Sequence, residues 1–321
     1  MIDFAKFQLT DHHRLTNRAE NLFNVGDMNL NKSKKLELNQ GTIRLIELAL
    51  VEDLGPGLLI EGDITTSSTI DSEALGEAEL VAKEELVVCG HTVATAIFAK
   101  IDSSVSYTVL HPDGARVSPG TTVATITGKQ QALLVGERLS LNFFQRMSGI
   151  ATATAKYVEI AGSKVQLLDT RKTTPGLRQL EKYAVTVGGG FNHRIGLYDE
   201  VLIKNNHIDA AGGDVARAIE LCRSKNAPGT VIEVEVRDMN ELEQAVSAKP
   251  DIILLDNYSP EEIRVAIYFI RSKDLGIKIE ASGGINESNL KAYAETGVDR
   301  ISLGALTHSV RSVDLSMRIT G

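Results

Sequence analysis

The chain has 321 residues, of which 43% are hydrophobic, and a formal net charge of −8 at pH 7. This composition predicts one large or two medium globular domains and argues against a nucleic-acid partner, which would need a basic surface. Cys89 and Cys222 form no CxxC pair, so we expect no disulfide framework or zinc site and predict a cytoplasmic location. We find neither a signal-peptide pattern nor an apolar run near the roughly 20 residues of a membrane span, so no membrane partner is predicted.

Residues 1–38 are polar throughout, and we predict a loosely packed arm with one helix near residues 14–24. From Gly41 onward apolar residues recur at helical spacing until the Gly-Pro-Gly turn at residues 55–57. Residues 78–82, 86–90, 105–109 and 122–126 are rich in β-branched residues and are predicted to be strands, with a helix over 92–100. This pattern predicts an N-terminal α/β domain.

Residues 131–161 form a long helical stretch, which Ser148 and Gly149 are expected to bend or break. Six short apolar runs follow at 165–168, 200–203, 231–234, 252–255, 278–281 and 300–303, each ending on a polar residue or glycine. Helices are predicted between them at 215–225, 241–248, 260–272 and 287–296. Strands that alternate with helices and carry polar residues at their C-terminal ends are typical of α/β barrel enzymes. The tail, residues 312–318, is expected to be a short helix that returns to the first domain.

Cationic side chains follow three segments at the predicted rim. Thr170, Arg171 and Lys172 come directly after the first barrel strand. His193 and Arg194 come after a run of glycines, and Lys204 follows the second strand. Arginine matches the geometry of carboxylate and phosphate groups, so this cluster predicts a substrate with several negative charges. The alternative is that Arg171 and Lys172 only pair with surface acids.

Two acids form the other half of the predicted site. Period-two alternation places Glu233 and Glu235 on one face of their strand, and Asp256 ends the next strand. A carboxylate inside a barrel needs a cation, and Mg²⁺ shared with a polyphosphate would suit Glu235 and Asp256. A Glu–Lys pair that only supports the barrel is the compatible alternative.

Glycine-containing loops close the last two predicted strands. They are Ser282, Gly283 and Gly284 after one strand and Leu303, Gly304 and Ala305 after the next. Glycine lets a backbone approach an anion closely, and late βα loops of barrels commonly bind phosphate. No P-loop and no dinucleotide-binding glycine fingerprint occurs in the sequence.

Together these motifs resemble the quinolinate phosphoribosyltransferase family, also called carboxylating nicotinate-nucleotide pyrophosphorylases. The resemblance runs from about residue 43 to 318. The blocks that carry it are Asp169-Thr170-Arg171-Lys172-Thr173, Gly189-Gly190-Phe191-Asn192-His193-Arg194, Leu202-Ile203-Lys204-Asn205-Asn206-His207, Glu233-Val234-Glu235-Val236, Leu255-Asp256-Asn257 and Glu280-Ala281-Ser282-Gly283-Gly284-Ile285.

The resemblance implies an N-terminal α/β sandwich-like domain (residues 39–148, with a C-terminal helix over 306–321) and an open seven-stranded α/β barrel (149–305). It implies a homodimer and Mg²⁺-dependent synthesis of nicotinate mononucleotide, CO₂ and pyrophosphate from quinolinate and 5-phosphoribosyl-1-pyrophosphate, a step of NAD biosynthesis. It also implies catalytic roles for Lys172, Glu235 and Asp256, with the two acids near the metal. The substrate contacts that it implies are Arg138 donated by the partner subunit, Thr170, Arg171, Lys172, His193, Arg194, Lys204, Glu235, Asp256 and the two glycine loops.

Three other functions are compatible with parts of the pattern. A strand-end lysine such as Lys204 permits a Schiff-base aldolase. A paralogue linked to molybdate transport would share the fold but not the substrate. A non-enzymatic protein that binds a sugar phosphate would release no CO₂.

Overall fold

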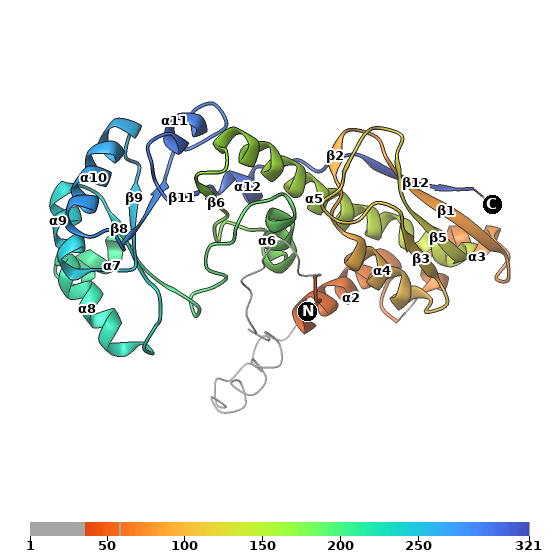
Figure 1. Ribbon diagram of the computed structural model, residues 1–321. Helices are drawn as coiled ribbons and strands as arrows, with labels where there is room; N and C mark the ends of the chain where they lie inside the picture. The colour runs from red at the N-terminus through yellow and green to blue at the C-terminus, as the bar shows by residue number, and fades with distance from the viewer. Residues whose placement is uncertain (1–35, 58, 321) are drawn as a thin grey trace, which may run out of the picture.

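The computed structural model describes residues 36–57 and 59–320, which form two domains side by side along one long helix (Figure 1). The predicted arm helix near residues 14–24 lies outside the described residues. The last residues of the predicted arm are packed: Leu36 is buried, and the Gln179 side chain donates a hydrogen bond of 2.8 Å to the Glu37 carbonyl. The first described helix, α2 (Gln40–Leu54), begins at Asn39, whose side chain caps it by accepting from the Thr42 N–H.

The N-terminal domain contains a four-stranded antiparallel sheet in the order β12-β1-β5-β3. Its elements are α2, η2 (Ile60–Gly62), α3 (Ile64–Thr69), β1 (Leu75–Ala82), β2 (Leu86–Val87), α4 (His91–Ile101), β3 (Ser106–Val109), β4 (Arg116–Val117), β5 (Thr122–Lys129) and β12 (Leu315–Ile319). Alternation along β1 buries Ala78, Leu80 and Ala82, and Phe98 of α4 belongs to one of the cores beneath the sheet. The expected strands and the α4 helix are confirmed, except that β2 covers only residues 86–87 of the strand expected over 86–90, and the short strand β4 is an addition.

Helix α5 (Gln130–Ala161) is continuous over 32 residues, so the expected break at Ser148 and Gly149 is wrong. The Ser148 hydroxyl bonds the backbone N–H and carbonyl of Cys89, both at 3.0 Å. A Cβ on Gly149 would lie 2.4 Å from the Arg311 carbonyl oxygen. These two small residues therefore let other chain segments approach the helix closely, and they do not break it.

The expected C-terminal helix is also wrong. Helix α12 (Ala305–His308) ends after four residues, and β12 then pairs antiparallel with β1. Leu315, Met317 and Ile319 alternate with Ser316 and Arg318, which is the period of a strand. The tail returns to the first domain as expected, but it does so by completing the edge of a sheet.

The C-terminal domain is built on six parallel strands in the order β6-β11-β10-β9-β8-β7. These strands confirm the six apolar runs. They are β6 (Gln166–Leu168), β7 (Val201–Ile203), β8 (Ile232–Val236), β9 (Ile252–Asp256), β10 (Lys278–Ser282) and β11 (Arg300–Ser302). Phe191 forms a single parallel bridge to Leu168 on the free side of β6, and this is the place of a rudimentary seventh strand.

Helices cover the outside of these strands (Figure 1). They are α6 (Arg178–Val187), α7 (Asn205–Ala210), α8 (Val215–Lys225), α9 (Met239–Ala248), α10 (Pro260–Lys273), α11 (Leu290–Ala294) and α12. Ser259 and Glu262 form a capping box at the start of α10, with Pro260 in its first turn. Helix α11 is shorter than predicted, and α6, α7 and α12 were not predicted as separate helices.

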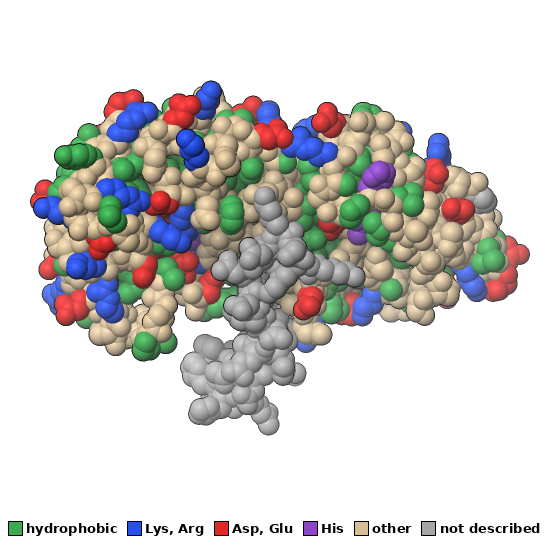
Figure 2. All heavy atoms as spheres, viewed as in Figure 1, with side chains coloured by type: hydrophobic (Ala, Val, Ile, Leu, Met, Phe, Trp, Pro, Cys, Tyr) green, Lys and Arg blue, Asp and Glu red, His purple; other side chains and the backbone are tan. Residues whose placement is uncertain are grey.

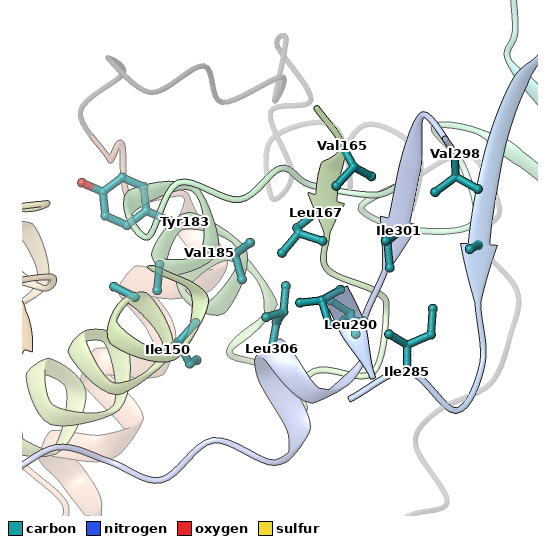
Figure 3. Close-up of a cluster of buried hydrophobic side chains, with 14 of the residues drawn as sticks. Ile150, Val165, Leu167, Tyr183, Val185, Ile285, Leu290, Val298, Ile301 and Leu306 are labelled. Atoms are coloured by element: carbon teal, nitrogen blue, oxygen red, sulfur yellow. The ribbon is translucent and has the colours of Figure 1, made fainter. Parts of the chain in front are cut away.

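The apolar core continues from the barrel into the long helix. Ile150 of α5, Val185 of α6, Leu167 of β6 and Leu306 of α12 face one another in Figure 3, and all four are buried. The two domains are therefore joined by packing as well as by the chain. Within the described residues, no helix is both long and apolar enough to cross a bilayer.

Candidate active site

The C-terminal ends of the six parallel strands surround a pocket of about 620 Å³. Parallel registers such as Ser282 opposite Asp256 and Val236 opposite Leu255 bring successive strand ends to one edge of the sheet. The pocket is lined by Thr170, Arg171, Lys172, His193, Arg194, Leu202, Lys204, Glu235, Leu254, Asp256, Asn257, Ser282, Gly283, Gly284 and Ser302. Figure 2 shows basic and acidic side chains interspersed over one face of the molecule. The pocket differs from this mixed surface because four of its lining residues are lysines or arginines.

A fully buried ion pair supports the first basic segment. Asp169 follows β6, and its carboxylate bonds the Lys182 ammonium of α6, with neither side chain exposed. The Asp169 carboxylate also accepts the His193 N–H at 2.9 Å, and Lys182 donates to the His193 carbonyl at 2.9 Å. Burial raises the pKa of Asp169 to about 6 and lowers the pKa of Lys182. The pair thus fixes the backbone that carries His193 and Arg194 against the end of β6.

The two guanidinium groups of the pocket belong to Arg171 and Arg194. Arg171 is exposed, whereas Arg194 is buried and donates from Nη1 to the Glu200 carbonyl at 3.2 Å. The pKa of Arg194 is lowered mainly by burial and secondly by the positive charge of Arg171. Two neighbouring like charges repel each other, and an anion bound between them would relieve that repulsion.

His193 lines the pocket, but its ring nitrogens face protein groups. Nδ1 accepts the Arg194 N–H at 2.7 Å, and Nε2 lies 3.1 Å from Glu233 Oε2 and 3.6 Å from Glu280 Oε1. Burial lowers the pKa of His193. An Nδ1 that accepts a hydrogen bond carries no proton, so this geometry favours the neutral ring with its proton on Nε2.

A cluster of buried and half-buried acids lies in the barrel beneath the pocket. Burial raises the pKa of Glu200 and of Glu280 to about 7, and it also raises the pKa of Glu233. Arg300 supplies positive charge there, with Nε 2.8 Å from Glu280 Oε2. Ligand atoms of His193, Glu200 and Glu233 lie within 4.8 Å of one another, a spacing that could hold a cation.

Two acids reach the pocket itself. Alternation along β8 places Glu235 and Glu233 on the inward side, as predicted, with Glu235 nearer the strand end. The ammonium of Lys204 lies 3.3 Å from Glu235 Oε2, and the Lys204 side chain is 51% exposed. Asp256 ends β9 and is partly buried. Two carboxylates beside several cations match the oxygen donors that Mg²⁺ takes alongside phosphate.

The glycine loop after β10 has two residues in the left-handed backbone region. Gly283 and Gly284 have φ values of +89° and +64°, which favour glycine. The N–H groups of these two residues find no acceptor among the described residues. The Gly284 carbonyl accepts from the Asn289 side chain at 3.1 Å, which holds the loop in place. Free N–H groups in such a loop suit a phosphate oxygen.

Eleven of the fifteen residues predicted for the site line this pocket, and the other four are Arg138, Leu303, Gly304 and Ala305. Gly304 lies beside the pocket, since a Cβ there would come within 3.0 Å of the Lys172 side chain. Arg138 lies on α5, and its nearest acid is Glu137 at 3.8 Å. The pocket residues that sequence reasoning did not single out are Leu202, Leu254, Asn257 and Ser302.

Comparisons with known proteins identify both domains. Residues 63–148 match the N-terminal domain of quinolinate phosphoribosyl transferase, and residues 150–318 match its C-terminal domain. A probable carboxylating nicotinate-nucleotide pyrophosphorylase of Bacillus subtilis is 43% identical over 86% of this chain and 93% of its own. A tobacco protein named quinolinate phosphoribosyltransferase (decarboxylating) 1b is 40% identical over 86% and 81% of the respective chains.

A solved structure has the same fold. The nicotinate-nucleotide pyrophosphorylase of Francisella tularensis superposes with a TM-score of 0.81 at 39% identity. The match covers 90% of this chain and 99% of that one. The similarity therefore spans both domains and the pocket.

Proposed function

The chain belongs to the quinolinate phosphoribosyltransferase family, and on that premise we propose how its pocket serves the reaction. The chain is a decarboxylating phosphoribosyltransferase, a carboxylating nicotinate-nucleotide pyrophosphorylase. It joins quinolinate to 5-phosphoribosyl-1-pyrophosphate and forms nicotinate mononucleotide, CO₂ and pyrophosphate. The observation that supports this assignment at the site is the convergence of Arg171, Lys172, Arg194 and Lys204 on one pocket. None of the relatives named above is an aldolase or a molybdate-transport protein.

We assign the quinolinate dicarboxylate to the side of the pocket formed by Arg171 and Arg194. Guanidinium groups bind carboxylates through paired, charge-assisted hydrogen bonds. Both ring nitrogens of His193 face protein groups, so His193 forms part of the pocket wall, and the two arginines bind the carboxylates. Holding both carboxylates orients the ring nitrogen toward the sugar and makes the first step effectively unimolecular.

We assign the phosphoribosyl donor to the opposite side. The free N–H groups of Gly283 and Gly284 would receive the 5-phosphate. Lys172 and Lys204 would stabilise the negative charge that develops on the departing pyrophosphate. Glu235 would stabilise the positive charge that develops on the sugar carbon. Glu235 and Asp256 fit Mg²⁺ by the chemistry of their donor atoms, and the bound ion would neutralise pyrophosphate charge.

Decarboxylation then follows from the product of the first step. Once the ring nitrogen is bonded to the sugar, it carries a positive charge. That charge stabilises the carbanion left when the adjacent carboxylate departs as CO₂, so no additional electron acceptor is required. A proton from water then adds to the carbanion and completes the product. The arginines keep the pyridine in place during this second step.

We further propose a homodimer in which Arg138 serves the pocket of the partner subunit. The exposed position of Arg138 outside its own pocket supports this arrangement, since its side chain is 63% exposed. The cytoplasmic location and the lack of a nucleic-acid partner stay predictions from composition.

Release of labelled CO₂ from quinolinate carrying the label in its 2-carboxylate tests the proposed function. We expect release that requires both the phosphoribosyl donor and Mg²⁺, with equal amounts of pyrophosphate and CO₂. Binding of both substrates without CO₂ release would contradict the assignment, as would release that does not depend on the donor.

A further inference from the structure

Asn257 has a left-handed backbone conformation at the wall of the pocket, with a φ of +59°. Among the described residues, Lys249 (φ +52°) is the other non-glycine residue with a positive φ. This conformation is costly for most L-residues and is tolerated best by glycine and asparagine. Asparagine, which tolerates a positive φ, therefore occupies the position between β9 and α10, next to Asp256.

The Asn257 side chain lies between Asp256 and the glycine loop. Its Nδ2 donates a hydrogen bond of 2.8 Å to Asp256 Oδ2, and its backbone N–H donates to the Ser282 carbonyl at 2.9 Å. A Cβ on Gly283 would lie 2.3 Å from Asn257 Oδ1, so the amide closely approaches the Gly283 backbone. One residue thus contacts both the Asp256 carboxylate and the proposed phosphate cradle.

The Asn257 amide that donates a hydrogen bond to Asp256 carries no charge. Glu235 faces the Lys204 ammonium, whereas the Asp256 carboxylate accepts no hydrogen bond within the described part of the chain except that from Asn257. An amide fixes the orientation of a carboxylate without cancelling its negative charge. Asp256 is therefore held in place and still available to a cation.

We propose that Asn257 is a positioning residue for the donor side of the pocket: it acts through Asp256, whose carboxylate it orients toward the bound magnesium pyrophosphate group. This inference rests on the proposed function, which places Asp256 near that group. We expect the effect of Asn257 on the donor side, because its hydrogen bonds within the described residues go to Asp256 and Ser282 and its amide approaches Gly283.

The test uses Asn257→Gly, which removes the amide and keeps a residue that tolerates the positive φ. Lys249→Gly is the matched control, since it makes the same backbone change at an exposed turn remote from the pocket. Calorimetry would measure binding of magnesium pyrophosphate and of phthalate, the benzene analogue of quinolinate. Steady-state assays would give the KM of each substrate, and wild-type CO₂ release would establish separately that the proposed function holds.

We expect Asn257→Gly to bind magnesium pyrophosphate about tenfold or more weakly, the effect of losing a hydrogen bond to a charged group. The KM of the phosphoribosyl donor should rise similarly. Phthalate affinity and quinolinate KM should stay within about twofold of wild type. Lys249→Gly should resemble wild type in all four measurements, and its thermal midpoint should match or exceed that of wild type, since glycine removes backbone strain. The thermal midpoint of Asn257→Gly should stay close to that of wild type, since relief of the positive φ offsets the lost hydrogen bond.

A double-mutant cycle with Asp256→Ala tests whether Asn257 acts through Asp256. If it does, Asn257→Gly should change magnesium pyrophosphate affinity little in the Asp256→Ala background. Wild-type affinity of Asn257→Gly for magnesium pyrophosphate would overturn the inference. Equal losses for phthalate and magnesium pyrophosphate, or additive effects in the cycle, would overturn it as well.

Discussion

Lys182 and Asp169 form an ion pair in which both side chains are 0% exposed, and the pair joins α6 to the end of β6. Each partner also bonds the backbone of His193, at 2.9 Å in both cases. The pair lies directly behind the pocket, so it supports the segment that carries His193 and Arg194. The stability of the fold and the geometry of the site therefore depend on the same two side chains.

Replacing Lys182 by methionine should destabilise the protein strongly. The change leaves the Asp169 carboxylate buried without its cation, which typically costs about 3–5 kcal/mol in the free energy of unfolding. Chemical denaturation would measure this loss. Lys100→Met is the control, because Lys100 pairs with Glu47 at the surface, where the side chains are 44% and 48% exposed, and such a pair contributes less than about 1 kcal/mol. Similar losses in the two variants would contradict the role of the buried pair.

Lys172→Ala should lower turnover by about a hundredfold or more with little change in thermal midpoint. The side chain is exposed and lines the pocket, so its removal costs charge stabilisation of the leaving group but little packing. The measurement is kcat for CO₂ release, alongside thermal unfolding. Lys225→Ala, in the last turn of α8, is a control that removes an exposed lysine outside the pocket. Near-normal turnover of Lys172→Ala would remove Lys172 from the catalytic machinery.

The buried acids predict a pH dependence of stability. The pKa of Glu200 is raised to about 7, above the ordinary value of 4.5, by burial first and by the Glu233 charge second. The folded state therefore binds this proton more tightly than the unfolded state, and its stability falls as pH rises from about 4.5 to about 7. The slope from one such group cannot exceed about 1.4 kcal/mol per pH unit.

Glu200→Gln should remove this contribution, so the variant should lose less stability between pH 5 and pH 8 than wild type. Urea denaturation at several pH values would measure the two profiles. Glu243→Gln, on an exposed position of α9, should leave the wild-type slope unchanged. Parallel profiles for wild type and Glu200→Gln would show that Glu200 does not titrate in this range.

Mixing two inactive variants tests the proposed donation of Arg138. In a hybrid dimer of Arg138→Ala and Lys172→Ala subunits, one pocket keeps its own Lys172 and receives Arg138 from the partner, while the other pocket loses both. Random exchange should then restore about a quarter of wild-type activity. The CO₂ assay after subunit exchange measures this recovery. If Arg138 instead served its own pocket, no hybrid site would be complete and no recovery would occur.

The sequence alone predicted the features that depend on local pattern. The six barrel strands were visible because each is a short apolar run that ends on a polar residue or glycine, and parallel strands place those ends at one edge. The pocket cations, Glu235, Asp256 and the Gly283 loop followed from the same rule. Helices α8, α9 and α10 lie where helices were predicted between these strands.

Only the tertiary structure decided the features that depend on partners distant in the chain. Gly149 and Ser148 resemble helix breakers in sequence, yet they permit close packing against Arg311 and Cys89 within a continuous helix. The tail is a strand because β1 offers it an unpaired edge. The Lys182–Asp169 pair joins β6 to the helix that follows it. The acids beneath His193 and the approach of the Asn257 amide to Gly283 arise where separate βα units meet. Periodicity reports which face of an element is buried, but not which charged group from another element lies opposite it.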